Sequence, residues 1–349
     1  MPDVSFTNFN LYNLNKPGLP LYKNARPWTE GEYAAKIDFS ARMLRLLGAD
    51  VYGFQELWHA GALADILATA GMEQEFTLLA PEGHAGGKIV CAGAVRSSIL
   101  VGQPEWIETF PEQFRLSSGG DDAQSGDIAV SLHTFSRPVL HFTIRPEADA
   151  APIHVFVCHF KSKGPTQIFR EPWYDNDVYS RHAEAIGGGL STIRRTAEAT
   201  ALRMILTDLM KGTREPVVVL GDVNDGLLSN TLNILTGQPR YLMGFSKGGG
   251  DTDLYTAQTL QQYRSTRDVY YTHVFNNERE SLDQILVSEE FYDNSRDRLW
   301  KFVELVVQND HLNFEDHRGL GTNDHGIIRA TFRYAPLRQE VERPADPGG

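Results

Sequence analysis

The sequence predicts an α+β fold in which two β-sheets pack on each other and helices cover the outer faces. Many short apolar runs with strand character are spread along the chain, whereas only three or four segments have helical periodicity. Strands and helices do not alternate regularly enough for a doubly wound parallel sheet. The pattern therefore favours sheet packed on sheet.

The first half of the chain supplies strands and two helices. Residues 4–11 alternate apolar and polar side chains, as a half-buried strand does. Thr29 and Glu32 form a capping box, which predicts the start of a helix that ends at Gly48. A second helix is predicted at 59–70. Further strands are predicted at 51–54, 89–95, 99–101, 128–132, 139–144 and 153–160.

The second half begins with a long aromatic and charged insert at 166–189, which ends in three glycines. A helix is predicted at 191–209, and a fully apolar strand at 217–220. Residues 232–256 have the composition of a loop. The remaining strands are predicted at 270–275, 282–287, 302–308 and 327–334.

Composition and charge limit the function classes. The 349 residues are 41% hydrophobic and 22% charged, which excludes a collagen, a coiled coil and a wholly disordered chain. The net charge of −12 gives no bulk positive field, so a nucleic acid would have to bind through a local basic patch or bound cations. No apolar run reaches the roughly 18 residues of a membrane span. Without a signal-peptide pattern at the start, we expect a cytoplasmic protein; export with the signal already removed is the alternative.

Polar side chains recur where predicted strands end, which is where a rigid sheet positions functional loops. Each one alone is more typical of an ordinary turn or a satisfied core residue. Because polar residues recur at so many strand ends, ordinary turns and satisfied core residues do not explain the whole set well. The residues are Asn10, Glu56, His159, Asp222, Asn224, Asp283, Asp324 and His325.

The segments around these residues resemble the motifs of the endonuclease/exonuclease/phosphatase superfamily. They occur in the family's order and extend over nearly the whole chain. They are TNFNL at 7–11, VYGFQE at 51–56, CHFKSK at 158–163, LGDVND at 220–225, SLDQ at 281–284 and TNDH at 322–325. The resemblance implies a four-layer α/β/β/α sandwich with two mixed sheets, of the deoxyribonuclease-I-like fold. We expect one such domain over 1–335 and a mobile tail over 336–349.

The resemblance also implies a divalent metal, Mg²⁺ or Mn²⁺. Carboxylate and amide oxygens are the hard ligands that these ions prefer. Glu56, helped by Asn10, is the expected metal anchor, and Asp324 is expected to complete this site or a second one. A divalent ion there would polarise a phosphoryl oxygen and offset charge on the leaving oxygen.

The catalytic roles are carried over from the family in the same way. Asp283 is expected to orient His325 and raise its pKa. His159 is expected to donate to a non-bridging oxygen or to protonate the leaving group. Asp222 is expected to orient or deprotonate the attacking water, and Asn224 to hold a phosphoryl oxygen.

Two further groups are candidate substrate contacts. Lys161 and Lys163 alternate with His159, so in an extended segment all three can share one face; a solvated turn is the alternative. The insert at 166–189 interleaves aromatic rings with arginines, which could stack bases and bind phosphates, or could pack back on the domain. Its candidate contacts are Arg170, Trp173 and Arg181.

Together these features predict a metal-dependent hydrolase that cleaves a phosphodiester by in-line attack of water. A nuclease is the first expectation. A phosphatase or lipid phosphodiesterase that acts on an inositol phosphate, a sphingomyelin-like lipid or another small ester is the alternative, and a non-catalytic binding protein on the same fold is the rival from another class. The oligomeric state stays open.

Overall fold

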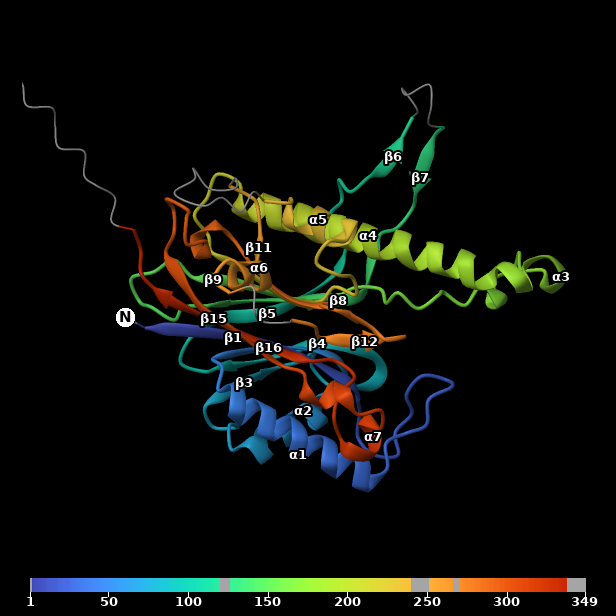
Figure 1. Cartoon of the computed structure of the whole chain (residues 1–349), viewed down its shortest axis with the longest axis horizontal. Coiled ribbons are helices and arrows are strands. Elements are labelled where there is room, and N and C mark those ends of the chain that lie inside the picture. Colours follow the sequence, from blue (N-terminus) through green and yellow to red (C-terminus); the bar gives the residue numbers. More distant parts are fainter. Residues whose placement is uncertain (1, 120–125, 240–250, 266–269, 338–349) are drawn as a thin grey trace, which may run out of the picture.

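The computed structural model describes residues 2–119, 126–239, 251–265 and 270–337, and within them two six-stranded sheets pack face to face (Figure 1). The first sheet has the order β15 (Trp300–Gln308), β16 (Ile327–Tyr334), β1 (Asp3–Leu14), β2 (Val51–His59), β4 (Ala85–Arg96) and β3 (Phe76–Leu79). The second has the order β11 (Tyr255–Thr256), β14 (Asp283–Val287), β10 (Val217–Asp222), β9 (Ile153–His159), β8 (Thr134–Ile144) and β5 (Leu100–Thr109).

Helices cover the outer faces, which confirms the four-layer sandwich. α1 (Glu30–Leu47) and α2 (Ala60–Ala70) lie against the first sheet, whereas α4 (Ala183–Met210) and α5 (Asn230–Thr236) lie against the second (Figure 1). The capping box of α1 is present, because Glu32 N donates to Thr29 Oγ1 at 3.3 Å and the Glu32 side chain accepts from Thr29 N. α1 ends at Gly48, whose φ of 55° is the left-handed conformation that glycine tolerates.

Shorter helices and strands lie outside the two sheets and the four helices that cover them. They are α3 (Asn176–Tyr179), α6 (Ala257–Gln262), α7 (His317–Leu320), β6 (Leu116–Ser118), β7 (Ile128–Val130), β12 (His273–Phe275) and β13 (Glu278–Glu280). None of the helices in the described ranges has the length and apolarity to cross a bilayer.

Two sequence-based expectations about helices were wrong. α4 begins at Ala183 rather than at 191, so the three glycines lie inside the helix and do not end the insert. At Gly187 the reason is a close approach: Thr166 N donates to Gly187 O at 3.0 Å, and a Cβ at Gly187 would lie 2.3 Å from Thr166 O. α5, with Ser229 as its N-cap, overlaps the start of the segment 232–256 that was expected to be a loop. Of the tail expected at 336–349, residues 338–349 lie outside the described residues.

Candidate active site

The inner face of each central strand changes from apolar to polar near the strand's end. In β1, Val4 and Phe6 belong to the core between the sheets. Because side chains alternate along a strand, Asn8 and Asn10 point the same way, towards the second sheet. Asn10 Nδ2 donates to Asp222 Oδ2 across the two sheets at 3.1 Å. The candidate site is thus the polar continuation of the intersheet core.

The strands of the second sheet follow the same rule. The inner-face residues of β10 are Val218, Leu220 and Asp222, and the first two belong to the intersheet core. His159 ends β9 in the same way, and it is paired with Asp222 in the parallel ladder between β9 and β10. Asp222 is also paired with Asp283 of β14 in the antiparallel ladder. Strand register therefore places these three side chains next to one another.

Irregular backbone shapes the neighbouring part of the first sheet. The β1–β2 pairing shifts register after Asn10, and the β2–β4 pairing shifts after Phe54. Within these irregular stretches, Tyr12, Asn13 and Glu56 have φ values of 53°, 54° and 61°, which are rare for residues other than glycine. Asn13 N donates to Glu56 Oε2 at 2.9 Å, so the irregular β1 backbone holds the Glu56 carboxylate in place.

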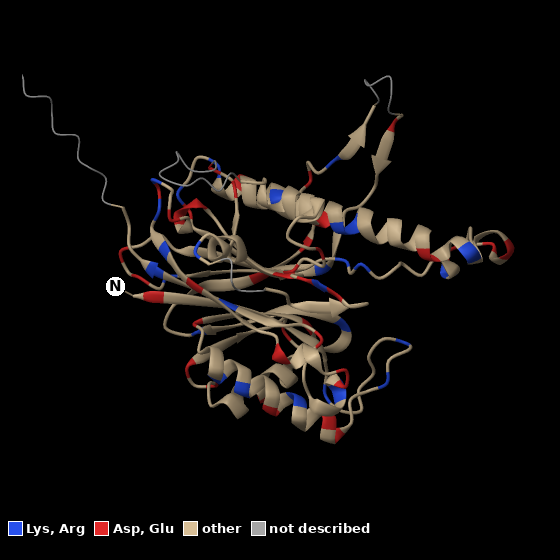
Figure 2. Ribbon diagram, viewed as in Figure 1, with Lys and Arg blue, Asp and Glu red and all other residues tan. Residues whose placement is uncertain are grey.

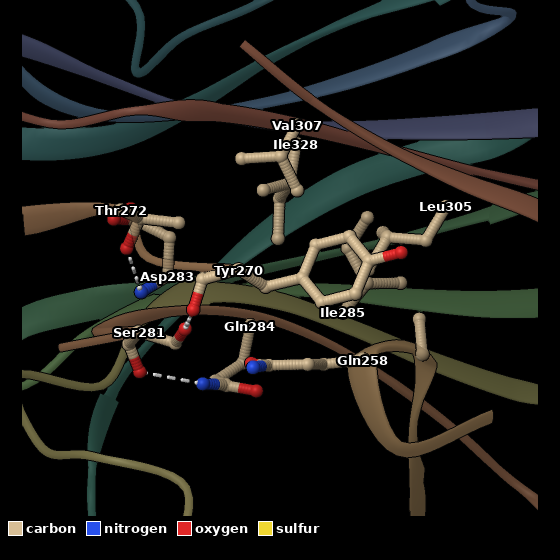
Figure 3. Close-up of a pocket in the computed structure, with 11 residues that line it drawn as sticks. Gln258, Tyr270, Thr272, Ser281, Asp283, Gln284, Ile285, Leu305, Val307 and Ile328 are labelled. Carbon is tan, nitrogen blue, oxygen red and sulfur yellow. Dashed lines mark hydrogen bonds between the residues drawn. The ribbon is translucent and has the colours of Figure 1, made fainter. Parts of the chain in front are cut away.

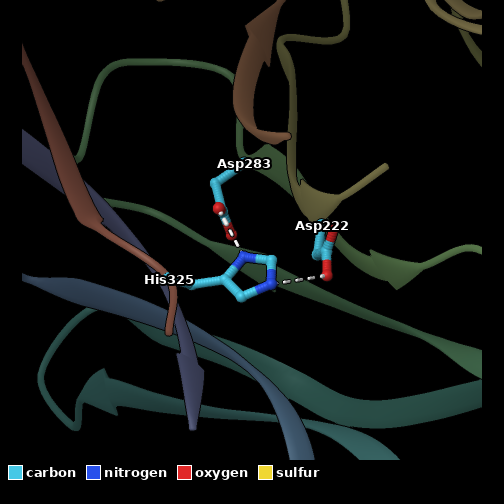
Figure 4. Close-up of side chains that lie close together, drawn as sticks. All are labelled: Asp222, Asp283 and His325. Atoms are coloured by element: carbon cyan, nitrogen blue, oxygen red, sulfur yellow. Dashed lines mark hydrogen bonds and ion pairs between the residues drawn. The ribbon is translucent and has the colours of Figure 1, made fainter. Parts of the chain in front are cut away.

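His325 and Asp283 form a buried, hydrogen-bonded pair (Figure 4). His325 Nδ1 lies 2.8 Å from Asp283 Oδ2. Asn8 Nδ2 donates to Asp283 Oδ1 at 3.1 Å, and Gln55 Nε2 donates to Asn8 Oδ1 at 2.8 Å. Burial alone would lower the pKa of His325, but the negative charges of Asp283 and Asp222 hold it well above its ordinary value. The two aspartates therefore favour the protonated form of His325, and the hydrogen bond to Asp283 fixes its orientation.

The interior behind this pair is tightly packed. A cavity of about 10 Å³ lies beside Asp283, between Tyr270 and the apolar side chains Val307 and Ile328 (Figure 3). Thr272 Oγ1 accepts a hydrogen bond from Asp283 N at 3.1 Å. A cavity of this size holds one water molecule at most, so it is not a substrate site.

Asp222 lies between the two imidazoles. Its Oδ2 is 3.5 Å from His159 Nε2 and 3.8 Å from His325 Nε2, and its Oδ1 accepts from Asn224 N at 2.9 Å. Burial raises the pKa of Asp222, and the charges of Asp283 and Glu56 raise it further against the opposing effect of His325. A carboxylate with a raised pKa is suited to accept a proton.

His159 differs from His325 in its charge state. It is 3% exposed, and burial together with the positive charge of Arg137 lowers its pKa well below the ordinary value. These surroundings favour the neutral form of the imidazole. Its Nε2 is 3.9 Å from Glu56 Oε1, and its Nδ1 is buried with no hydrogen-bond partner among the described residues.

Asn224 follows Asp222 in a left-handed turn. Its φ is 55°, a conformation that asparagine tolerates better than most residues. Its Nδ2 donates to Phe160 O at 3.1 Å. The structure thus brings Asn224 to the site but commits one of its two amide hydrogens to the backbone.

A cation fits beside Glu56 and Asp324. Burial raises the pKa of Glu56, and the neighbouring charge of Asp324 raises it further. Asp324 Oδ1 is buried and has no hydrogen-bond partner among the described residues. Two carboxylates that influence each other electrostatically, one of them with an unused buried oxygen, are oxygen donors of the kind that Mg²⁺ or Mn²⁺ prefers. Asn10 Oδ1 accepts from Tyr12 N at 2.9 Å and keeps a second lone pair.

A buried lysine supports the segment that carries Asp324. Lys36 is fully buried in α1 and donates to Thr322 O at 3.1 Å and to Asn323 Oδ1. Asn323 Nδ2 in turn donates to Asn10 O at 2.9 Å. Burial lowers the pKa of Lys36 to about 7. This network connects α1 to the segment that carries Asp324 and to Asn10 of β1.

The site holds a second cluster of potential ligand atoms. Potential ligand atoms of Asp222, Asp283 and His325 lie within 4.8 Å of one another (Figure 4). His325 Nδ1 is already bound to Asp283, and a protonated imidazole does not bind a metal. With its Nδ1 committed to Asp283, His325 makes this cluster less suited to a cation than the oxygen donors of Glu56 and Asp324.

The strand alternation that would give His159, Lys161 and Lys163 a common face does not reach the lysines. β9 ends at His159, so the alternation of a strand does not continue to the lysines. Lys161 Nζ donates to Gly164 O at 3.1 Å, whereas Lys163 Nζ is paired with Glu280 at 2.7 Å.

The aromatic and arginine insert projects away from the catalytic cluster. α3 and the start of α4 extend past the sheets at the end to which β9 leads (Figure 1). Trp173 and Tyr179 pack edge to face with ring centroids 5.2 Å apart, and Arg170 stacks on Phe169. Arg170, Trp173 and Arg181 belong to this projecting insert.

Several functional candidates were not predicted from the sequence. Asn8 and Gln55 lie inside the quoted motifs, and Asn8 lies two residues before Asn10 on the same strand face, which is a usable signal. Lys36 and Arg137 lie outside every motif. No spacing in the sequence distinguishes them from ordinary surface cations.

Comparison with known proteins agrees with this architecture. The family model described as "Endonuclease/Exonuclease/phosphatase family" matches residues 9–317. An endonuclease/exonuclease/phosphatase from Bacteroides vulgatus is similar in structure, with 13% identity, a TM-score of 0.55 and coverage of 96% of this chain and 100% of that one. No curated protein matches the sequence significantly.

Two further solved structures share the fold at low identity. A mannosyl-6-phosphatase from Bacteroides thetaiotaomicron is 12% identical, with a TM-score of 0.53 and coverage of 95% and 100%. D. rerio TDP2 complexed with single-strand DNA product is 14% identical, with a TM-score of 0.54 and coverage of 95% and 99%. Because the family model matches most of the chain, the chain belongs to the endonuclease/exonuclease/phosphatase family.

Proposed function

We propose that this protein is a divalent-metal-dependent phosphoesterase that hydrolyses a phosphodiester by in-line attack of water. The observation that carries the proposal is the environment of Asp222. A carboxylate with a raised pKa lies between a cationic imidazole, His325, and a neutral one, His159. Groups whose pKa values are driven apart in one site are typical of acid–base catalysis.

The residues divide the chemistry as follows. Asp222 accepts the proton of the attacking water, and its buried surroundings favour the protonated form that results. His325 donates from Nε2 to a phosphoryl oxygen, because its Nδ1 is held by Asp283. A Mg²⁺ or Mn²⁺ ion held by Asn10, Glu56 and Asp324 would polarise the phosphoryl group and offset charge on the leaving oxygen.

The position of His159 decides between its two expected roles. In an in-line displacement the attacking and leaving oxygens lie on opposite sides of phosphorus. His159 Nε2 is only 3.5 Å from the Asp222 oxygen. A group so close to the base is on the side of the nucleophile, so we assign His159 to a non-bridging oxygen and not to the leaving group.

A nucleic acid is the phosphodiester that the surrounding features favour. The insert with Arg170, Trp173 and Arg181 projects from the end of the sandwich to which β9 leads, where a long substrate would pass (Figure 1). Along the ribbon of both sheets and of the helices that cover them, basic and acidic residues are intermixed (Figure 2). Binding would therefore depend on local contacts and bound cations, and not on the overall field.

A substrate panel tests the proposal. Bis-p-nitrophenyl phosphate, p-nitrophenyl phosphate, plasmid DNA, RNA and sphingomyelin are each offered with Mg²⁺ or Mn²⁺. We expect turnover of the diester and of at least one nucleic acid, and loss of both in Asp222→Asn. Preference for the monoester would indicate a phosphatase, and turnover of sphingomyelin alone a lipid phosphodiesterase. No turnover of any of the five would contradict the proposal.

A further inference from the structure

A groove of about 510 Å³ opens beside the catalytic cluster, on the side of β2, β4 and β8. Its lining combines aromatic rings with cations. The residues that matter are Tyr22, Trp58, Lys88, Arg137 and Lys161. None of the catalytic roles assigned above uses this groove.

Hydrogen bonds connect the groove directly to the site. Arg137 Nη1 donates to Phe160 O at 3.2 Å, the same carbonyl that accepts from Asn224 Nδ2 at 3.1 Å. On the opposite wall, Trp58 Nε1 donates to Asn13 Oδ1 at 3.1 Å, and Asn13 N donates to Glu56. The groove therefore adjoins the site along two of its walls.

Two cations of the groove have no acidic partner. Among the described residues, no carboxylate oxygen lies within 4.0 Å of the side-chain nitrogens of Arg137 or Lys161. Lys88, by contrast, is 3.7 Å from Glu108. The nearby carboxylate of Glu198 accepts from two backbone amides, Ser136 N and Lys161 N, each at 2.8 Å.

Both unpaired cations are half-buried. Burial and the charge of Arg137 lower the pKa of Lys161. Two desolvated cations that repel each other favour an anion between them, and a phosphate oxygen accepts strong hydrogen bonds from both.

The aromatic wall offers a flat surface next to these cations. Tyr22 packs edge to face on Trp58, with ring centroids 5.1 Å apart and an interplanar angle of 80°. Trp58 is 5% exposed, whereas Tyr22 is 48% exposed. Trp58 thus supports Tyr22, and the free face of Tyr22 is available to a planar group.

We propose that this groove is a substrate subsite that binds a second phosphate between Arg137 and Lys161 and a planar ring against Tyr22. The inference rests on the proposed function, because the subsite would bind a phosphate next to the one that the catalytic residues hydrolyse. The second phosphate can belong to a nucleic acid backbone or to a small bisphosphate, and the test separates the two.

Direct binding tests the subsite without turnover. Isothermal titration in Mg²⁺ compares thymidine 3′,5′-bisphosphate, glucose 1,6-bisphosphate and thymidine 5′-monophosphate. Arg137→Met and Lys161→Met should each weaken both bisphosphates roughly tenfold or more and the monophosphate much less, which is the scale of one charged hydrogen bond. Arg137→Lys should recover part of the affinity. Arg42→Met, which removes an exposed cation of α1, is the matched control and should change nothing.

Tyr22→Ala separates the two sources of the second phosphate. If the subsite holds a nucleotide, this change should weaken the thymidine bisphosphate and leave the glucose bisphosphate unchanged. Equal affinity of wild type for the mono- and bisphosphates, or equal losses for all three ligands in Arg137→Met and Lys161→Met, would overturn the proposal. If the protein hydrolyses no phosphate ester but shows the expected binding preference, the proposed function fails and the subsite stands.

Discussion

Replacing Asp283 with asparagine tests the catalytic pair with the smallest change in shape. Each oxygen of Asp283 accepts from a different donor: Oδ1 from Asn8 Nδ2 at 3.1 Å and Oδ2 from His325 Nδ1 at 2.8 Å. An asparagine offers one oxygen and one NH₂ group, so one of these two donors must face another donor. The substitution therefore disrupts either the hydrogen bond that orients His325 or the hydrogen bond from Asn8 that holds residue 283.

The magnitudes follow from that single unmet hydrogen bond and from the lost charge. A buried polar group left without a partner costs about 1–3 kcal/mol of stability. Loss of a positioned acid lowers turnover by about 10²-fold. That factor corresponds to ~2.7 kcal/mol of transition-state stabilisation.

The pH dependence gives a second readout with a defined sign. Asp283 and Asp222 hold the pKa of His325 well above its ordinary value against the effect of burial. The stability from this pair is fully present below the unfolded pKa of about 6.5 and is lost as pH rises through the raised folded pKa. Activity that needs the imidazolium falls over the same alkaline range. In Asp283→Asn this alkaline limb should move to lower pH.

Steady-state hydrolysis of bis-p-nitrophenyl phosphate across pH, with urea unfolding in parallel, measures both effects. Glu290→Gln is the matched control, because Glu290 is a buried carboxylate just beyond the other end of β14 that accepts from Ser288 Oγ at 2.5 Å. It should alter stability without moving the pH profile. An Asp283→Asn protein with wild-type turnover and an unmoved alkaline limb would refute the reasoning.

Three further expectations concern other parts of the site. In a double-mutant cycle, His325→Ala and Asp283→Asn should be less than additive in turnover, since the two act as one unit; full additivity would show that they do not cooperate. Trp173→Ala with Tyr174→Ala should raise KM for an oligonucleotide, at about 1–3 kcal/mol per stacked base, and spare the chromogenic diester; equal losses on both substrates would make the insert structural. Lys36→Met should lower the free energy of unfolding by about 1–3 kcal/mol, because two buried carbonyl groups lose their donor; unchanged urea unfolding would contradict this.

The fold and the polar ends of the strands could be predicted because both depend on local pattern. Alternation along residues 4–11 and the capping box at Thr29 describe their own segments, and the structure has both elements. The motif set placed Asp222, Asp283 and His325 at element ends. Strand register pairs Asp222 with Asp283, and the packing of the two sheets brings His325 to them.

What could not be predicted depends on contacts between distant segments. In the sequence, the three glycines of α4 look like the end of a loop. The close approach of Thr166 to Gly187 is visible only in the packed structure. The same is true of the buried position of Lys36 under the candidate metal site and of the unpaired Arg137. The common face expected for Lys161 and Lys163 required a strand that continues past His159. β9 ends there, because the neighbouring ladder sets the end of a strand.

The role of a divalent metal at Glu56 and Asp324 is the central claim, and one titration tests it most directly. Protein stripped with EDTA is assayed on bis-p-nitrophenyl phosphate while Mg²⁺ or Mn²⁺ is added back, for wild type and for Glu56→Gln. We expect no turnover without metal, recovery on addition, and a metal concentration for half-recovery that is at least tenfold higher in Glu56→Gln. Full turnover by the metal-free protein, or identical metal titrations for the two proteins, would contradict the claim.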